Sequence, residues 1–318
     1  MHARFVLRSI AFVLAALLAA APVLADPVSI ADGAQHKGSL ESRNHAIRIG
    51  DDATVDGAAQ TRNGAVNVGD RSRVGALGSR NGAITVGRDS QVGDVAARNG
   101  RVAIGAGSTA GQLEIRNGRV TIGSKARVAA IDSRNGSIDL EDGSEVRGKV
   151  SSRNGSIGGG RDVRVGADVE TRNGAIRFGK GSQIDGGIRS RNGDVRLNGV
   201  KVDGSVHSRS GDILIADGST ITGDVVIEID SPAEQGASWF FGWFATITYG
   251  DAGSIHLSGT STVNGDVILR LSENYDGQAP SLTIDPGSRV LGRVEADPRV
   301  TLNVADGAVA KGVQHRRD

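Results

Sequence analysis

Apolar residues recur at alternate positions through most of the chain, and most of them are valine or isoleucine. Ile84 and Val86 form one such pair, and Val102 and Ile104 form the next. A period of two in β-branched residues is typical of a strand that buries one face. No stretch after residue 25 keeps a helical period of apolar residues. The pattern therefore predicts an all-β protein built from short strands.

An Arg-Asn pair returns in every block of 18 or 19 residues, within the pattern V-x-x-V-x-x-R-N-G-x-I-x-I-G-x-G-S-x. The arginines are Arg43, Arg62, Arg80, Arg98, Arg116, Arg134, Arg153, Arg172, Arg191 and Arg209, and in the last copy Ser210 replaces the asparagine. The asparagines that are followed directly by glycine are Asn63, Asn81, Asn99, Asn117, Asn135, Asn154, Asn173 and Asn192. Self-similarity at one short period predicts stacked repeats. Asparagine and glycine both tolerate a left-handed backbone, so we expect the chain to turn there in that conformation.

Asn-Gly is also a strong hairpin signal, so an antiparallel array of ten hairpins is an alternative fold. Half a repeat leaves strands of about seven residues, shorter than the roughly nine to eleven of a membrane barrel. A soluble open sheet of about twenty strands is unusual. We therefore predict a single-stranded parallel β-solenoid, or β-helix, with 18–19-residue coils, a right-handed turn and irregular C-terminal coils. Each coil has three short strands with valine and isoleucine pointing inward.

Residues 1–25 differ from the rest of the chain. Arg4 and Arg8 precede an apolar run from Ile10 to Ala21, and small residues end at Ala25. This order is typical of a secretory signal peptide, and the run is shorter than the roughly twenty residues of a membrane helix. An uncleaved anchor is the alternative. We expect an exported bacterial protein, located in the periplasm or associated with the cell surface or outer envelope.

Four regions follow from these patterns. Residues 1–25 are the signal peptide, 26–228 the regular solenoid, 229–312 irregular coils that cap it, and 313–318 a disordered tail. The chain has no cysteine, so disulfides cannot stabilise it. Basic and acidic residues nearly balance, and no nucleic-acid partner is expected.

Stacking places equivalent residues of successive coils above one another. The asparagines can then form a structural ladder of amide hydrogen bonds. Stacked arginines about 4.8 Å apart would repel by nearly 0.9 kcal/mol per adjacent pair in unscreened water. Either they bond to corner carbonyls and to neighbours such as Glu41, Glu114, Asp132 and Glu170, or they bind a polyanion such as an acidic polysaccharide or lipopolysaccharide.

An aromatic insertion interrupts the repeat after residue 228. It contains Trp239, Phe240, Phe241, Trp243 and Phe244. One interpretation is a cap that protects the solenoid, since the ends of repeat proteins need cover. The other is an exposed patch that binds a membrane surface or a partner.

The sequence does not indicate an enzyme, a cofactor or a metal site. The histidines are scattered, and no pair has catalytic or metal-ligand spacing. Asp139, Asp142 and Glu145 are close in sequence, but in this repeat we expect them to be solvated turn residues. Calcium-binding nonapeptide repeats require G-G-x-G-x-D twice per coil, which this chain lacks. Acyltransferases of the left-handed β-helix type use three equivalent hexapeptides, whereas the three sides here differ.

The stretches "GSQIDGGIRSRNGDVRLNG" and "GSTITGDVVIEI" resemble two bacterial families. One is the bactofilin-like, polymer-forming cytoskeletal proteins, and the other is the exported β-strand-repeat family of putative adhesins. The resemblance covers roughly residues 36–228 and, more weakly, 253–312. It implies a structural or surface role without catalysis, and end-to-end assembly in the bactofilin-like case. The leader and the aromatic insertion depart from the bactofilin-like pattern.

Two functions follow as expectations. The first is a structural or self-assembling element of the cell envelope that associates through the solenoid ends. The second is a surface binding or adhesion module that uses the arginines for anionic glycans or the aromatic insertion for membrane. Self-association should survive high salt, whereas polyanion binding should fall steeply with salt.

Overall fold

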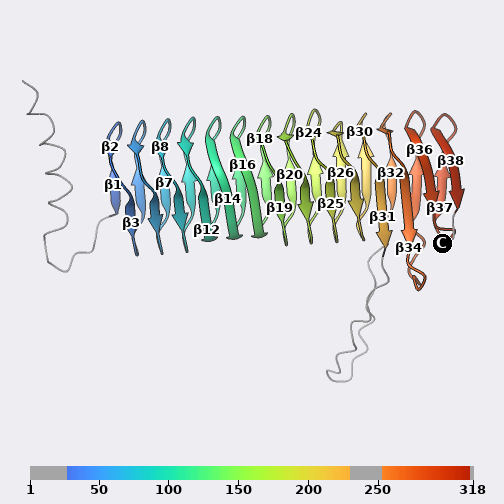
Figure 1. Cartoon of the computed structure of the whole chain (residues 1–318), viewed down its shortest axis with the longest axis horizontal. Helices are drawn as coiled ribbons and strands as arrows, with labels where there is room; N and C mark the ends of the chain where they lie inside the picture. The colour runs from blue at the N-terminus through green and yellow to red at the C-terminus, as the bar shows by residue number, and fades with distance from the viewer. Residues whose placement is uncertain (1–26, 230–252, 316–318) are drawn as a thin grey trace, which may run out of the picture.

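The repeats stack into an all-β solenoid, as the computed structural model shows for residues 27–229 and 253–315. Strands of successive coils pair in parallel, and the coils follow one another along a single axis (Figure 1). With about 4.8 Å between coils, the fourteen coils form a rod roughly 60–65 Å long. This confirms the predicted parallel β-solenoid. Among the described residues no helix is long and apolar enough to cross a membrane.

One wall of the solenoid is a 14-stranded sheet, to which each coil contributes one strand. Its strands are β1 (Val28–Ile30), β4 (Ile47–Ile49), β7 (Val66–Val68), β10 (Ile84–Val86), β13 (Val102–Ile104), β15 (Val120–Ile122), β17 (Ile138–Leu140), β20 (Ile157–Gly159), β23 (Ile176–Phe178), β26 (Val195–Asn198), β29 (Ile213–Ala216), β32 (Ile255–Leu257), β35 (Ser281–Ile284) and β37 (Thr301–Val304).

The other strands form two further walls, which join in a 24-stranded sheet. The second wall has the short strands β2 (Gln35–His36), β5 (Thr54–Val55), β8 (Arg73–Val74), β11 (Gln91–Val92), β18 (Glu145–Val146), β21 (Arg164–Val165), β24 (Gln183–Ile184), β27 (Lys201–Val202), β30 (Thr220–Ile221) and β33 (Thr262–Val263). The third wall has β3 (Leu40–Ser42), β6 (Ala59–Thr61), β9 (Leu77–Ser79), β12 (Val95–Asn99), β19 (Val150–Ser152), β22 (Val169–Thr171), β25 (Ile188–Ser190), β28 (Val206–Ser208), β31 (Val225–Ile229) and β34 (Val267–Leu271).

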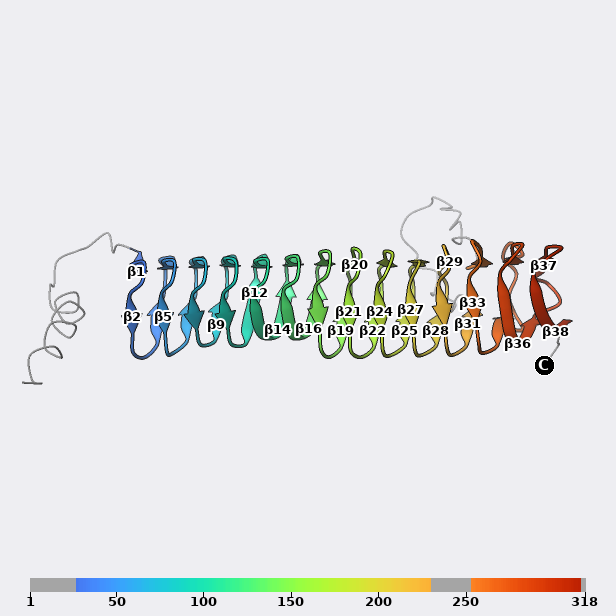
Figure 2. The ribbon, with the colours of Figure 1, turned by 90° about the horizontal axis from the view of Figure 1, so that it is seen from above.

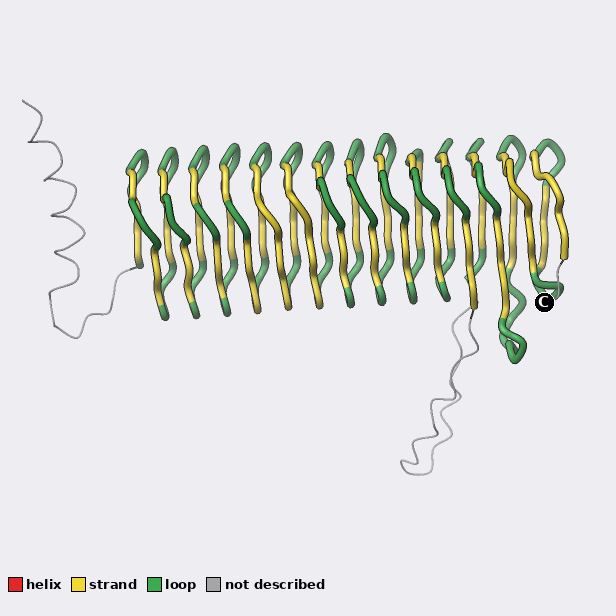
Figure 3. Tube along the Cα trace, viewed as in Figure 1, coloured by secondary structure: helices red, strands yellow, loops and turns green. Residues whose placement is uncertain are grey.

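Four coils differ from the expected three strands. In them the second and third strands are continuous, as β14 (Thr109–Asn117), β16 (Arg127–Asn135), β36 (Arg289–Ala296) and β38 (Val309–His315). Figure 3 shows strands and turns recurring at equivalent places from coil to coil. The alternation of inward and outward side chains breaks once inside each of β14 and β16, since Ala110 and Leu113 are both buried three residues apart, as are Val128 and Ile131. The two strands nevertheless pair in constant register from Thr109 and Arg127 onward.

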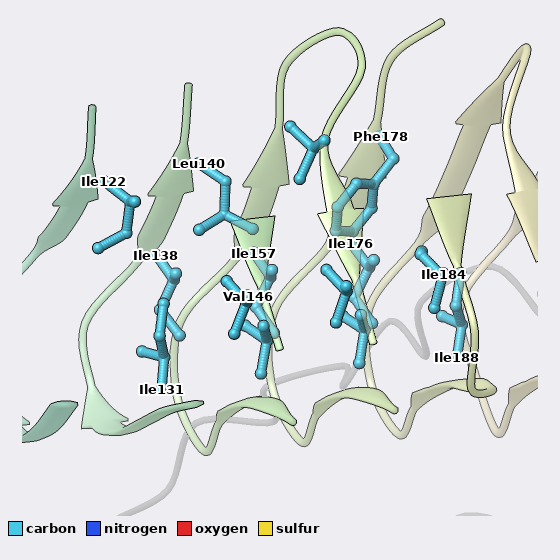
Figure 4. Close-up of a cluster of buried hydrophobic side chains, with 14 of the residues drawn as sticks. Ile122, Ile131, Ile138, Leu140, Val146, Ile157, Ile176, Phe178, Ile184 and Ile188 are labelled. Atoms are coloured by element: carbon cyan, nitrogen blue, oxygen red, sulfur yellow. The ribbon is translucent and has the colours of Figure 1, made fainter. Parts of the chain in front are cut away.

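The core is a column of stacked apolar side chains. Ile157 pairs with Ile138 on one side and with Ile176 on the other, and all three are at most 1% exposed. Figure 4 shows these equivalent residues one after another inside the solenoid. Burying a Val or Ile side chain contributes about 1.5–3 kcal/mol, so the repeated rows supply the stability that disulfides cannot.

The corner after each strand of the 14-stranded sheet contains a residue with positive φ, such as Arg71 (φ 53°) or Asp89 (φ 53°). A buried serine follows in most coils, and Ser90 is an example. The hydroxyl of Ser90 accepts a hydrogen bond from the backbone N–H of Ser72 at 3.1 Å and donates to the carbonyl of Gly69 at 2.8 Å. The buried serines at this corner, which we call the inner serine ladder, are Ser72, Ser90, Ser108, Ser144, Ser182, Ser219, Ser261 and Ser288; the hydroxyls of Ser144 and Ser288 have no hydrogen-bond partner among the described residues.

The left-handed turn expected at Asn-Gly is wrong. In the described chain no asparagine has positive φ, and of the glycines behind them only Gly118 does (φ 155°). Glycine is needed there for another reason: a Cβ on Gly82 would collide with the carbonyl oxygen of Gly64, one coil earlier. Close approach of stacked backbones therefore selects glycine at this corner.

The C-terminal coils extend the rod, as expected, but they leave its last strands unpaired on one edge among the described residues. Residues 253–315 continue both sheets in place of closing them, with a register irregularity between β36 and β38. Val313 pairs with Val294 and His315 with Ala296, so the expected disordered tail at 313–318 is wrong for Val313–His315. The described residues of the expected capping region, 229–312, thus extend the rod.

Candidate binding surface

The Asn-Gly corner carries an unbroken amide ladder along the rod. The side-chain Nδ2 of Asn81 donates to Oδ1 of Asn63 at 2.8 Å, and Asn99 donates to Asn81 at 2.8 Å. The same bond joins each neighbouring pair from Asn44 to Asn192, and the Ser210 hydroxyl ends the series on Oδ1 of Asn192 at 3.2 Å. The structure therefore brings all the expected asparagines together, and their amides bond mainly to each other.

A buried hydroxyl before each arginine holds this corner in most coils. Ser79 donates to the carbonyl of Gly64 at 3.0 Å and accepts from the N–H of Gly82 at 2.9 Å. Thr61 is bonded to its own corner in the same way. The motif is therefore best written [S/T]-R-N-G. The side chain of its first residue points inward, and the side chain of the arginine points outward.

The arginines form a single row on the outer face of the third wall, next to the asparagine ladder. Leu77 and Ser79 point inward, so Gly78 and Arg80 point outward by strand alternation. All ten arginines of the row are exposed: Arg43, Arg62, Arg80, Arg98, Arg116, Arg134, Arg153, Arg172, Arg191 and Arg209. Backbone hydrogen bonds such as Asn99 N–H to the Arg80 carbonyl, at 2.8 Å, keep successive arginines in register.

The row is largely unpaired. From Arg43 to Arg191, none of its guanidiniums forms an ion pair or hydrogen bond with a side chain or carbonyl of the described residues. Arg209 has a partner. The expected pairing with neighbouring carboxylates is therefore wrong for these nine arginines.

Those carboxylates bond elsewhere. Glu170 pairs with Lys149 and, at 3.0 Å, with Arg189, and Asp132 accepts a hydrogen bond from Ser151 at 2.6 Å. Of the four carboxylates named above, only Glu170 is thus neutralised by cationic side chains of the described residues.

Two shallow grooves follow the row. One has a volume of about 600 Å³ and runs past Arg80, Arg98 and Arg116, and the other has about 780 Å³ and runs past Arg153, Arg172 and Arg191. Both are lined by Asp132 and Arg134, so they form one continuous surface, which we call the arginine track.

The charge of the side chains on the floor of the track changes along its length. In the first groove the floor positions are Gln60, Gly78 and Ala96, which carry no charge, followed by Glu114 and Asp132 in the next two coils. In the second groove Arg189 bridges Asp168, at 2.9 Å, and Glu170. A hydrogen bond from the N–H of Gly187, together with Arg189, lowers the pKa of Asp168. The floor is therefore uncharged beside Arg62, Arg80 and Arg98, and acidic beside Arg116 and Arg134.

The like-charged row ends at Arg209. The next coil places Glu228 at the equivalent position, because Ser208 pairs with Ile227. Arg270 follows and forms an ion pair with Glu228 at 3.2 Å. Beyond Arg209 the row thus alternates in charge.

The aromatic insertion, with Trp239, Phe240, Phe241, Trp243 and Phe244, lies outside the described residues. Its flanks are described: β31 ends at Ile229, and Gly253 stacks on Gly211 at the Asn-Gly corner. The shorter insertion between β34 and β35 leaves from the same edge, where Figure 1 shows β31 and β34 ending. In it the Tyr275 hydroxyl donates to the Gln278 carbonyl at 2.6 Å.

The described residues contain no group of three or more histidine, aspartate or glutamate side chains able to hold a metal ion. His256 and Asp285 approach within 2.8 Å on the outer face of the 14-stranded sheet. His256 of this half-buried pair lines a small open depression together with Ser254, Ser281 and Thr283.

Both ends of the described solenoid carry strands with one unpaired edge. At the C-terminal end β37 and β38 are last in their walls, and at the N-terminal end β1, β2 and β3 are first (Figure 2). Val304 is 38% and Val313 42% exposed, although their partners in the preceding coil, Ile284 and Val294, are fully buried. The last coil therefore presents apolar side chains along the axis.

No family model, curated protein or solved structure matches this chain.

Proposed function

We propose that this chain is an exported, non-enzymatic rod that associates end to end as a structural element of the bacterial cell envelope. The observation that carries the proposal is the exposed final coil, whose inward-facing side chains lack a following coil. Unpaired strand edges favour addition of another strand, and natural proteins usually protect them. A second copy of the same chain can supply that protection.

The two ends fit each other in register. Leu302 and Val304 point along the same rows as Val28 and Ile30, because each coil of the 14-stranded sheet repeats these positions. On the third wall Val313 occupies the row that begins at Leu40. Removal of residues 1–25 would leave only Asp26 and Pro27 before β1. End-to-end contact would continue all walls and bury the exposed apolar rows.

Electron microscopy of residues 26–318 at low and high salt tests this proposal. We expect filaments many times longer than the roughly 60 Å rod that persist in high salt, because backbone pairing and apolar contacts are weakly screened. Replacing Val304 and Val313 by lysine should abolish the filaments. Replacing Leu291 and Val309 by lysine is the matched control, since these residues are 43% and 40% exposed but point outward. Discrete single rods from the unmodified chain at all concentrations would disprove end-to-end association.

A further inference from the structure

The arginine track lies along the side of the rod and is not explained by contacts at its ends. We propose that the track binds a linear acidic polysaccharide, which lies parallel to the rod axis with its carboxylates on successive guanidiniums. This proposal is independent of end-to-end association, because every arginine of the track belongs to one chain.

The guanidiniums of the arginine row from Arg43 to Arg191 carry positive charge that no carboxylate of the described residues neutralises. From Arg43 to Arg191 the row has no carboxylate partner among the described residues, although acidic side chains lie one or two positions away on the same wall. Like charges stacked one coil apart oppose folding and do not hold the corner. The asparagine ladder and the buried hydroxyls already perform that role. A ligand that neutralises the row would remove the repulsion.

The shape of the track fits an extended polymer. The two grooves join at Asp132 and Arg134, so the surface is long, open and straight, as a polymer requires, and is not a closed pocket for a small molecule. Gly78 and Ala96 leave its floor low between Arg80 and Arg98. We therefore place the strongest binding between Arg62 and Arg98, where the floor residues Gln60, Gly78 and Ala96 carry no charge, and not beyond Arg116, where Glu114 and Asp132 line the groove.

The side chains that line the track indicate which class of polymer it can bind. A guanidinium fork matches a carboxylate with two parallel hydrogen bonds. Among the described residues no Phe, Tyr or Trp side chain lines either groove and His207 is the one ring there, so the described track offers little of the stacking surface that single-stranded nucleic acids use. A regular row of equal charges favours a chain with a carboxylate on each sugar.

The test measures binding of fluorescent polygalacturonate, with neutral dextran as the uncharged comparison. The chain with Val304→Lys and Val313→Lys serves as the background for every variant, so that filament formation cannot add avidity. The track variant replaces Arg80, Arg98 and Arg116 by glutamine. The matched control replaces Arg73, Arg164 and Arg289, which are exposed arginines on the second wall with the same total charge.

We expect the track variant to lose at least about tenfold in affinity and to reduce the slope of log K against log salt by about three. The control should change the slope by less than one-third of that amount. Equal losses in both variants would show that only net charge matters and would overturn the track. Failure of the background chain to bind polygalacturonate at low salt, or binding of inorganic polyphosphate alone, would overturn the polysaccharide assignment. Neither outcome bears on filament formation, which is measured separately.

Discussion

The ring of Phe178 occupies the space that a side chain on Gly159 would need. The two residues pair in adjacent strands, β20 and β23, and a Cβ on Gly159 would collide with the Cδ1 and Cε1 atoms of Phe178. Phe178 is 2% exposed, and Leu140 and Leu197 occupy the flanking coils of the same row. The small residue Gly159 in one coil thus leaves room for the large side chain of Phe178 in the next.

We expect Gly159→Val to destabilise the chain by about 1–3 kcal/mol, because the added methyl groups overpack this row. Phe178→Val in the same chain should recover part of that loss by restoring the space. Denaturant unfolding of the two single variants and the double variant measures the coupling. Additive effects would show that the two positions are independent, contrary to the contact.

The asparagine ladder gives a second prediction. Asn99→Ala removes the hydrogen bonds to Asn81 and from Asn117, and should cost roughly 1–2 kcal/mol, since an ordinary hydrogen bond contributes about 0.5–1.5 kcal/mol. Asn67→Ala is the control, because the side chain of Asn67 has no hydrogen-bond partner in the described part of the chain. An equal change in the free energy of unfolding for both variants would argue against the ladder.

Two buried hydroxyls of the inner serine ladder should contribute differently to the free energy of unfolding. Ser90→Ala should cost about 1–3 kcal/mol, because it leaves the Ser72 N–H and the Gly69 carbonyl without this partner inside the protein. The hydroxyl of Ser144 is equally buried but has no partner among the described residues, so Ser144→Ala should be nearly neutral. Thermal unfolding of both variants checks the difference, and a larger loss for Ser144→Ala would be inconsistent with it.

Acid should unfold the rod through its corner aspartates. The N–H groups of Gly187 and Arg293 donate to Asp168 and Asp266, at 2.8 and 2.7 Å, and lower the pKa of each carboxyl. A lowered pKa in the folded state contributes stability above the unfolded value of about 3.9. That stability disappears as the pH falls through the folded pKa.

Asp168→Asn should therefore flatten the fall in melting temperature below about pH 4. Asp306→Asn should leave that fall unchanged, because Asp306 is exposed and has no hydrogen bond or ion pair within the described residues. Parallel pH profiles for the Asp168 variant and the unmodified chain would contradict the assignment.

The arginine row should make stability depend on salt. Arg98→Gln removes a charge flanked by Arg80 and Arg116 and should raise the melting temperature at low ionic strength by relieving repulsion. The difference should shrink as salt screens the row. Arg73→Gln, on the second wall, should show a smaller effect. A destabilised Arg98→Gln chain would mean that this arginine makes contacts that hold the corner.

Much of the fold followed from the linear pattern. The period of Ile84, Val86, Val102 and Ile104 predicted strands, coil length and inward positions, because stacking forces the same residue into the same environment in every coil. Asn81 and Asn99 could be assigned to a ladder on that argument alone. The inner serines also had a signal, the repeated Gly-Ser pair, but its hydrogen bonds depend on backbone directions at the corner.

The sequence by itself determined the parallel solenoid, its repeat and the outward row of arginines, because a period of two inside a period of 18 or 19 leaves few other arrangements. Only the tertiary structure decided that carboxylates such as Glu170 pair with Lys149 and Arg189 and leave the row unpaired. It also decided that the last coil leaves Val304 and Val313 exposed, and that glycine follows asparagine because backbones approach closely and not because φ is positive. These outcomes depend on distances between coils, which a repeat pattern does not contain.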